Sequence, residues 1–449
     1  MSARAAAVAS APLADVVVEG VTLSAHAQAA LCQLAQRQEP DLPCERVAQQ
    51  WLRDWVVGRQ VAQGISAERL FPARHVAYPL EIEVERLWIH LLTQLSGPAF
   101  SQAWAAERKR LGWQAVKPGA THRAFLAATP AFRLDDRLSP AQQRLAARLP
   151  VLRQCVHSAC TSLSLSELWG RMNVQSRTAV LDGDWRPVQA AGDELLQARF
   201  ADRWLPSQPG WQAQDVAALR GGLQARLQRA AWVRLRGLDG DPHGPREGWA
   251  ELSATLTDVD IEAYYRAHSD DFARIESLQG WRGRCATALC AQQIEARLRA
   301  LQAPAQLSAL AEAPVAGWQL EPVHWRLDDS EAKQNARERW SLSLLMAAQP
   351  GEPPLGVRPP GVDSVGREWV QLSARSMGVH PLSSETVRYQ SRLALTLDRM
   401  REGWAQAQVQ WLQDADIRWG DGRRGWPESW TAAVLAWPDA QQGHGHSHD

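Results

Sequence analysis

Three histidines alternate with small residues near the end of the chain. His444, His446 and His448 precede Asp449, so imidazole and carboxylate groups gather in one short segment. Imidazole nitrogens bind divalent cations such as Zn²⁺, Ni²⁺ and Cu²⁺. Ordering a flexible tail costs conformational entropy, so the pattern predicts weak binding of such an ion and no required cofactor. A solvated tail that holds no metal is the alternative.

Six cysteines, at positions 32, 44, 155, 160, 285 and 290, could bind metal, exchange disulfides or simply pack. Cys155/Cys160 and Cys285/Cys290 share a C-x4-C spacing. Five residues of regular helix turn a side chain by roughly 140°, which would point the two thiols apart. The N-terminus has no continuous apolar stretch and does not resemble a secretory signal. We therefore expect reduced, buried thiols rather than a disulfide framework.

The sequence lacks the common catalytic signatures. It contains no G-x-S-x-G, no G-x-x-x-x-G-K-[ST], no H-E-x-x-H, and no Gly-rich turn between a strand and a helix. Asp239 and Asp241 lie in a Gly/Pro-rich stretch without the further oxygen ligands of a calcium loop. Any chemistry must therefore come from isolated side chains that the fold brings together.

Composition narrows the class of protein. The chain has 449 residues, of which 45% are hydrophobic and 22% charged, as in a globular protein of two or three domains. Its 49 basic and 49 acidic residues balance, which argues against a general nucleic-acid binder. No apolar run approaches the ~18 residues of a membrane span. The 22 Trp either fill cores or, with the many Arg, form a surface that binds other proteins.

Hydrophobic periodicity predicts a mainly α fold with a small α+β element. Val47, Trp51 and Trp55 lie on one stripe of a helix over 45–63, and a long helix over 385–413 carries a second stripe. Helical patterns also continue through 139–175, 213–236 and 283–301, and from Asp328 to Ala348. A short strand pair is predicted over 16–23 around Gly20, and further strands at 323–327, 368–372, 377–382 and 416–419. The Pro/Gly-rich stretch 350–361 predicts no regular structure.

Breaks in these patterns divide the chain into seven segments. They are a disordered N-terminus (1–13), a helical N-terminal domain (14–236), a linker (237–248), a helical connector (249–317), a small α+β domain (318–384), a helix and strand that return to the N-terminal domain (385–419), and a flexible His-containing tail (420–449).

The second half resembles the SurA-like, parvulin-type peptidyl-prolyl isomerases. Thr257-Asp-Val-Asp-Ile-Glu-Ala-Tyr-Tyr-Arg-Ala-His-Ser-Asp-Asp-Phe272 resembles the helix before the family's isomerase domain. Val323-His-Trp-Arg-Leu327 resembles its first strand and Gly378-Val-His380 its last. Residues 385–419 resemble the segment that returns to the chaperone part, and 16–64 resemble its N-terminal segment.

The resemblance implies site residues. In the family, two histidines on adjacent strands form a hydrogen-bonded core, and Met or Phe side chains line the proline pocket. His324 and His380 would be that pair, and Met346, Met377 and Trp325 would contact the client. The sequence departs from the family between Ala348 and Glu368, where a short Pro-rich stretch replaces the expected pocket residues. We therefore expect a reduced isomerase domain with weak or no activity.

These observations predict a cytoplasmic folding or assembly chaperone that binds a protein client, with a metalloenzyme subunit as one candidate, and that contacts neither nucleic acid nor membrane. One alternative is a helical structural or adaptor protein without a client-folding role. The other is a genuine peptidyl-prolyl isomerase.

Overall fold

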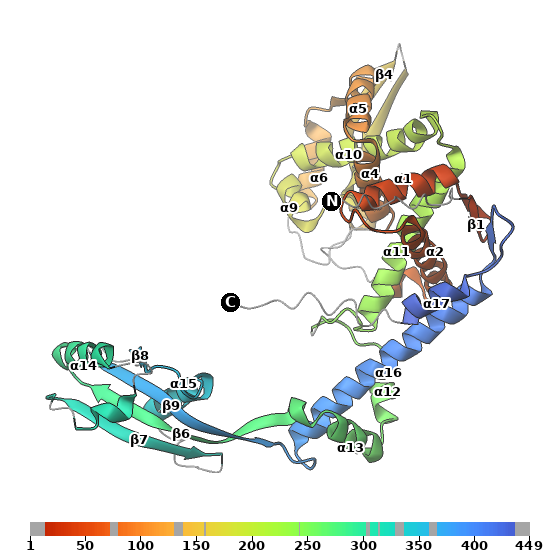
Figure 1. Ribbon diagram of the computed structural model, residues 1–449. Helices are drawn as coiled ribbons and strands as arrows, with labels where there is room; N and C mark the ends of the chain where they lie inside the picture. Colours follow the sequence, from red (N-terminus) through yellow and green to blue (C-terminus); the bar gives the residue numbers. More distant parts are fainter. Residues whose placement is uncertain are drawn as a thin grey trace, which may run out of the picture. The chain divides into compact units, whose positions relative to one another are not determined.

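The computed structural model confirms a mainly α fold with small sheets (Figure 1). The residues that it describes are 14–71, 80–129, 138–156, 159–241, 243–301, 306–312, 315–327, 336–358 and 366–435. The chain forms two compact units. We call Met1–Ala250 with Leu397–Asp449 the helical unit, and Glu251–Thr396 the α+β unit.

The helical unit is built mostly from amphipathic helices around one large core. Its helices are α1 (Ala25–Gln36), α2 (Cys44–Gly64), α3 (Ala67–Leu70), α4 (Leu80–Ser96), α5 (Pro98–Leu111), α6 (Ala120–Ala127), α7 (Pro140–Ala147), α8 (Leu165–Trp169), α9 (Val174–Leu181), α10 (Arg186–Trp204), η1 (Leu205–Ser207), α11 (Ala213–Leu235) and α17 (Glu428–Leu435). Two helices cross the boundary between the units, α12 (Trp249–Ala254) and α16 (Glu385–Asp414).

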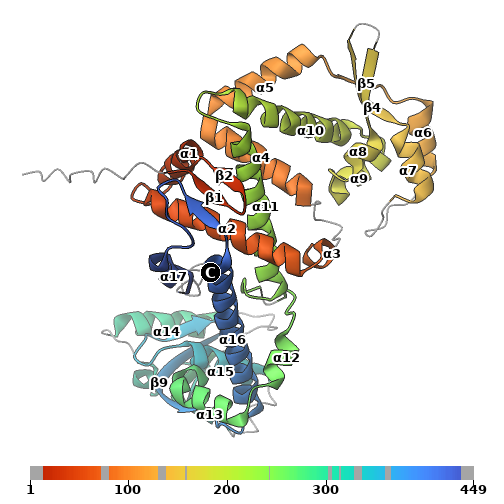
Figure 2. The same cartoon turned by 90° about the vertical axis from the view of Figure 1, so that its right-hand side faces the viewer.

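The two ends of the chain meet in one sheet of the helical unit. Strands β1 (Val16–Val18) and β2 (Val21–Leu23) form a hairpin, and β10 (Ile417–Trp419) pairs with the outer edge of β1. The blue C-terminal strand accordingly lies beside β1 in Figure 2. Buried residues of the last segment join the core that α2 and α11 form. The predicted strands at both ends are thus confirmed.

Small residues bring α2 and α11 into close contact. A Cβ atom placed on Gly58 would lie 2.0 Å from the backbone oxygen of Ala225, so only glycine fits there. The ring of Trp55 lies over Gly221, and the ring of Trp51 lies over Gly222. The stripe predicted for α2 is therefore used for packing against α11.

A buried charge cluster crosses the same helix pair. Asp54 of α2 and Arg229 of α11 form an ion pair, with 2.7 Å between Oδ1 and Nε, and both side chains are buried. Arg53 lies beside them; burial and the charge of Arg229 lower its pKa to about 10, although Asp54 acts in the opposite direction. Such a cluster fixes which helix faces meet, because shifting the helices would leave a buried charge without its partner.

A second core of the helical unit contains a small sheet that the sequence did not predict. Strands β3 (Gln114–Ala115), β4 (Pro150–Val156) and β5 (Ala159–Ser164) pair in that order. The prediction of continuous helix over 139–175 is therefore wrong. Leu152 of β4 and Leu163 of β5 lie directly opposite each other and are both buried in this core, and such a cross-strand pair stabilises strands once the neighbouring strand is present.

The α+β unit has a four-stranded antiparallel sheet in the order β7-β6-β9-β8. Helix α14 covers one face and α15 the other, because Trp369 packs with α14 while its neighbour Val370 packs with α15. The elements are α13 (Asp258–Ala267), η2 (Ser269–Phe272), β6 (Ala273–Cys285), α14 (Ala288–Ala300), η3 (Leu307–Leu310), β7 (Trp318–Arg326), α15 (Ala336–Ala347), β8 (Leu355–Val357) and β9 (Arg367–Val379).

Strand β6 corrects several predictions for this half of the chain. It follows η2 directly, so 249–317 is not a helical connector. The predicted strand 323–327 is not the first strand of the unit, because all but its last residue belong to β7. The segments 368–372 and 377–382 belong to one strand, β9, up to Val379, rather than two. The stretch 350–361 includes the short strand β8. Local sequence hid β6 because its two glycines and four charged residues resemble a loop, whereas pairing with two neighbours makes it a central strand.

The expectation of reduced cysteines is also wrong, because the structure pairs all six. The disulfides are Cys32–Cys44, Cys155–Cys160 and Cys285–Cys290. Neither C-x4-C pair lies in a regular helix: one spans the β4–β5 hairpin, and the other joins the end of β6 to the first turn of α14. In the part of the chain that the structure describes, no helix is both long enough and apolar enough to cross a membrane.

Candidate functional site

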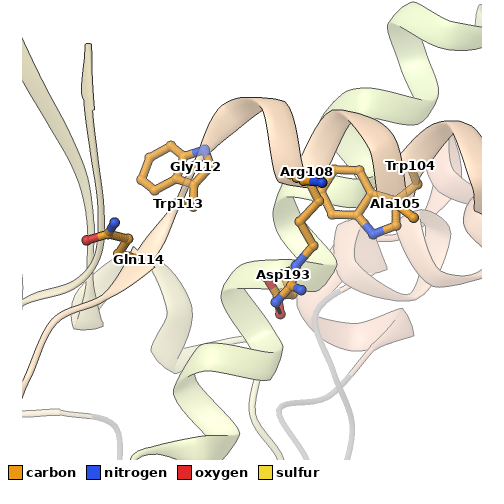
Figure 3. Close-up of a pocket in the computed structure, with 8 residues that line it drawn as sticks. Trp104, Ala105, Arg108, Gly112, Trp113, Gln114 and Asp193 are labelled. Carbon is orange, nitrogen blue, oxygen red and sulfur yellow. Dashed lines mark hydrogen bonds and ion pairs between the residues drawn. The ribbon is translucent and has the colours of Figure 1, made fainter. Parts of the chain in front are cut away.

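An open groove of about 800 Å³ lies on the helical unit beside α5 (Figure 3). Most of its lining comes from the second half of α5 and the residues that follow it, and one side chain comes from α10. The residues are Trp104, Ala105, Arg108, Lys109, Gly112, Trp113, Gln114 and Asp193.

Gly112 creates the groove by ending α5. It adopts the left-handed conformation with φ of 62°, and its N–H donates to the carbonyl of Arg108. The chain then turns from helix to the short strand β3, so Trp113 and Gln114 lie across from the last turns of α5 (Figure 3). The groove is thus set by a helix end, which local sequence encodes in Gly112.

A bidentate ion pair forms the floor between α5 and α10. Arg108 donates from Nε to Oδ1 of Asp193 at 3.1 Å and from Nη2 to Oδ2 at 2.6 Å. This hydrogen bonding raises the pKa of Arg108, so its positive charge is held in one place. Both side chains remain substantially exposed, so the ion pair contributes little to the stability of the fold. Its main effect is to fix the position of the Arg108 guanidinium in the groove.

Two half-buried tryptophans give the groove an apolar surface. Trp104 packs against Phe200 of α10 with ring centroids 5.6 Å apart, and Trp113 packs against the second core. Each ring is held on one side by the protein and lines the groove on another. Lys109 adds a cation at the rim. This combination suits a polypeptide segment with apolar and acidic side chains, because Trp and Arg are the residues that dominate protein interfaces.

The sequence did not predict this groove. Trp104 and Trp113 were part of the general Trp surplus, and Asp193 comes from an element 80 residues farther along the chain. The only local signal was Gly112 between two tryptophan-containing turns.

The two histidines assigned to a catalytic pair are not brought together. His324 is exposed on β7, opposite Gln279 of β6. His380 follows β9, which lies on the other side of β6. The backbone of His380 has a structural part: its N–H donates to Phe272, and its carbonyl accepts from the hydroxyl of Tyr265 at 2.9 Å.

The three residues predicted to contact a client are also dispersed. Trp325 is buried in the core beneath α15, and Met346 is partly buried in the same cluster. Met377 lies near the end of β9 with 53% of its surface exposed. Two of these side chains thus pack inside the unit, whereas Met377 faces solvent.

The first and last long strands of this sheet, β6 and β9, are neighbours. Charged residues, and no pair of histidines, lie where these two strands meet among the described residues. Glu368 of β9 is fully buried, and its Oε1 forms an ion pair with the Nε of Arg284 on β6 at 2.9 Å. Its Oε2 accepts from the hydroxyl of Ser341 on α15 at 3.2 Å. The neighbouring Arg282 donates to Glu321 of β7 at 2.7 Å. The cluster ties three strands and one helix together.

We predict that Glu368→Ala lowers the free energy of unfolding of the α+β unit by about 3 kcal/mol, because it leaves the charge of Arg284 without its buried partner. Urea unfolding followed by circular dichroism measures this loss. The control is Glu276→Ala, which removes an exposed carboxylate on the same sheet and should cost less than about 1 kcal/mol. Equal losses in the two variants would contradict the structural role given to Glu368.

A metal site is not evident among the described residues, which contain no cluster of three or more His, Cys, Asp or Glu suited to an ion. His444, His446 and His448, for which metal binding was predicted, lie outside the described residues.

Comparison with known proteins gives little further guidance. No family model matches the chain, and no curated protein matches it. Among solved structures, the foldase protein PrsA from Lactococcus lactis aligns over 95% of this chain and 98% of its own, with a TM-score of 0.18 and 8% sequence identity. A similarity at that level supports no argument about fold or function, so the site must be interpreted from its own residues.

Proposed function

We propose that the protein is a chaperone that binds segments of unfolded or assembling polypeptides in the groove between Trp104 and Trp113. The observation that carries the proposal is the groove itself: an open, amphipathic channel with two fixed aromatic rings, an oriented arginine and a lysine, and no catalytic group. Such a surface binds many sequences, because aromatic rings and a guanidinium recognise side-chain types rather than one sequence.

The order of elements supports a parvulin-like plan for this chaperone. The α+β unit is inserted between α13 and α16, and the chain then returns to the sheet that its N-terminus begins. The first and last long strands of the unit, β6 and β9, are neighbours, as the strands that carry the histidine pair are in the SurA-like family. The charged cluster at their junction favours a scaffold without the family's chemistry.

We predict that Trp113→Ala weakens client binding about tenfold, because it removes one aromatic wall of the groove while leaving the helices intact. Fluorescence anisotropy with a labelled, permanently unfolded polypeptide measures the dissociation constant. Trp340→Ala, a half-buried tryptophan of the α+β unit, is the matched control and should leave binding unchanged. Identical affinities for the two variants would rule out the groove. Failure of the unaltered protein to bind would favour the helical adaptor instead.

We predict no isomerase activity above background in a protease-coupled assay with a proline-containing peptide. The barrier of ~18–20 kcal/mol comes from amide resonance, and lowering it needs a proline pocket with placed hydrogen bonds. His324 and His380 lie on opposite sides of β6, and Trp325 is buried. A robust rate that disappears in His324→Ala would instead establish the genuine isomerase.

The proposal extends to the client that the protein binds and to the cellular compartment in which it acts. A metalloenzyme subunit is the candidate client, supported by the histidines at 444, 446 and 448, which could deliver or retain an ion. The sequence predicts the cytoplasm, whereas three disulfides favour an oxidising compartment. Acid quenching of cells followed by alkylation decides between them, since a cytoplasmic protein should carry free thiols at rest.

A further inference from the structure

The disulfide Cys155–Cys160 differs from the other two in its exposure. The two cysteines are directly opposite each other on β4 and β5, and both are exposed. The other disulfides each contain a cysteine that is almost inaccessible to solvent: Cys32 is 1% exposed, and Cys285 and Cys290 are 2% and 1% exposed. Cys44, the partner of Cys32, is half-buried, so Cys155–Cys160 is the pair in which both residues are exposed. A thiolate that attacks a disulfide must reach a sulfur atom, and this pair is the most accessible of the three.

This pair lies on the same sheet face as the rim of the groove. Gln114, which lines the groove, is opposite Arg153 in the β3–β4 ladder, and Arg153 and Cys155 are two residues apart on β4. Residues two apart on a strand, and residues directly opposite, point to the same face. Because a strand rises about 3.3 Å per residue, the disulfide stands roughly 7 Å along the sheet from the rim.

The hairpin can open this disulfide without losing its structure. Strands β4 and β5 pair continuously from Leu152 opposite Leu163 to Val156 opposite Ala159, so backbone pairing holds the hairpin in addition to the disulfide. In contrast, Cys32–Cys44 joins two helices, and Cys285–Cys290 closes the turn between β6 and α14. Arg153, exposed on the same face as Cys155, supplies a positive charge that favours the thiolate formed on opening.

We propose that Cys155–Cys160 is a thiol–disulfide exchange site whose substrates are cysteine-containing polypeptides held in the groove. A client thiolate attacks one sulfur of the pair, forms a mixed disulfide and releases the other cysteine as a thiolate. A second client thiolate attacks the client sulfur of the mixed disulfide, which forms the client disulfide and leaves both protein cysteines reduced. The client loses two electrons and two protons, and the pair gains them. A small-molecule disulfide such as oxidised glutathione restores the pair and is reduced to two thiols.

The assignment of the client as substrate rests on the proposed function, whereas exchange with small thiols does not. The first experiment therefore uses the full chain and glutathione buffers of increasing reducing strength, with maleimide trapping and mass spectrometry of each cysteine. We expect label on Cys155 and Cys160 under conditions that leave the other four cysteines unlabelled and the circular dichroism spectrum unchanged. Reduction of all three pairs together, or of Cys155–Cys160 last, would overturn the proposal.

The second experiment separates the exchange site from the groove. In Cys160→Ser, the free Cys155 should displace thionitrobenzoate both from a small aromatic disulfide and from an activated apolar peptide that contains one cysteine. Adding Trp113→Ala should slow the peptide reaction about tenfold and leave the small-molecule reaction unchanged, whereas Trp340→Ala should change neither. A peptide rate independent of Trp113 would overturn the client assignment alone. An unreactive Cys155 in a variant that still binds peptide would overturn the exchange site alone.

Discussion

Removing residues 397–449 should abolish cooperative unfolding of the helical unit. This segment supplies β10, which pairs with β1, and it buries seven large side chains in the core that α2 and α11 form. They are Trp404, Leu412, Ile417, Trp419, Trp426, Trp430 and Val434. Burial of such a side chain contributes ~1.5–3 kcal/mol, so their sum is comparable to the whole stability of a domain, about 5–15 kcal/mol. Thermal melts followed by circular dichroism measure the loss.

The matched control for this truncation is deletion of residues 436–449 alone. This deletion keeps every buried side chain named above, so the melting temperature should stay within error of the full chain. The same deletion removes the histidines at 444, 446 and 448, and titration calorimetry with Zn²⁺ should show that any metal binding is lost with them. An unchanged melt after removal of 397–449 would mean that the two ends of the chain do not share a core.

Gly58→Ala should destabilise the helical unit by about 3 kcal/mol, although alanine is the better helix former. The new Cβ would lie 2.0 Å from the backbone oxygen of Ala225, so α2 and α11 must separate. That movement would also lift the Trp51 and Trp55 rings away from the glycines that they cover on α11. Chemical denaturation of the full chain, followed by tryptophan fluorescence, measures the change.

The same substitution at Gly403 provides the control, with the opposite sign. Gly403 is inside α16, and a Cβ placed there meets nothing within 4 Å. Gly403→Ala should therefore raise stability by about 0.5–1 kcal/mol through helix propensity and a less flexible unfolded chain. Ala225→Gly should not rescue Gly58→Ala, because the collision is with the backbone. A neutral Gly58→Ala would mean that the helix crossing is looser than the structure has it.

The prediction for Cys155 and Cys160 was wrong because it assumed a helix where the chain forms a hairpin. Five residues of helix would separate Cys155 from Cys160, but five residues of a hairpin place them directly opposite each other. The spacing alone fits both geometries. Which one occurs depends on whether β4 pairs with β5 in a hairpin, and the same sheet takes its third strand, β3, from an earlier part of the chain.

Helices and strands that are marked by capping residues or by a short hydrophobic pattern could be predicted from the sequence alone. Thr257 begins α13 with a capping box, in which its hydroxyl accepts from the N–H of Asp260 and the Asp260 carboxylate accepts from the N–H of Thr257. The apolar stripes of α2 and α16, and the valine strands at the N-terminus, are equally local, because a period of 3.6 or 2 is visible in a short window. These elements carry the architecture that joins the chain ends.

Strand β6 and the groove could be recognised only from tertiary contacts. Strand β6 contains Gly280 and Gly283, which disfavour a strand in isolation, yet a Cβ on Gly280 would collide with the backbone of Gln371, and one on Gly283 with the ring of Trp318. Glycine is needed at these two positions because atoms of the neighbouring strands occupy the space of a side chain. The groove likewise needs Asp193 to orient Arg108 across two helices. Both features depend on contacts between residues far apart in sequence, and a pattern read along the chain contains no information about which distant residues will meet.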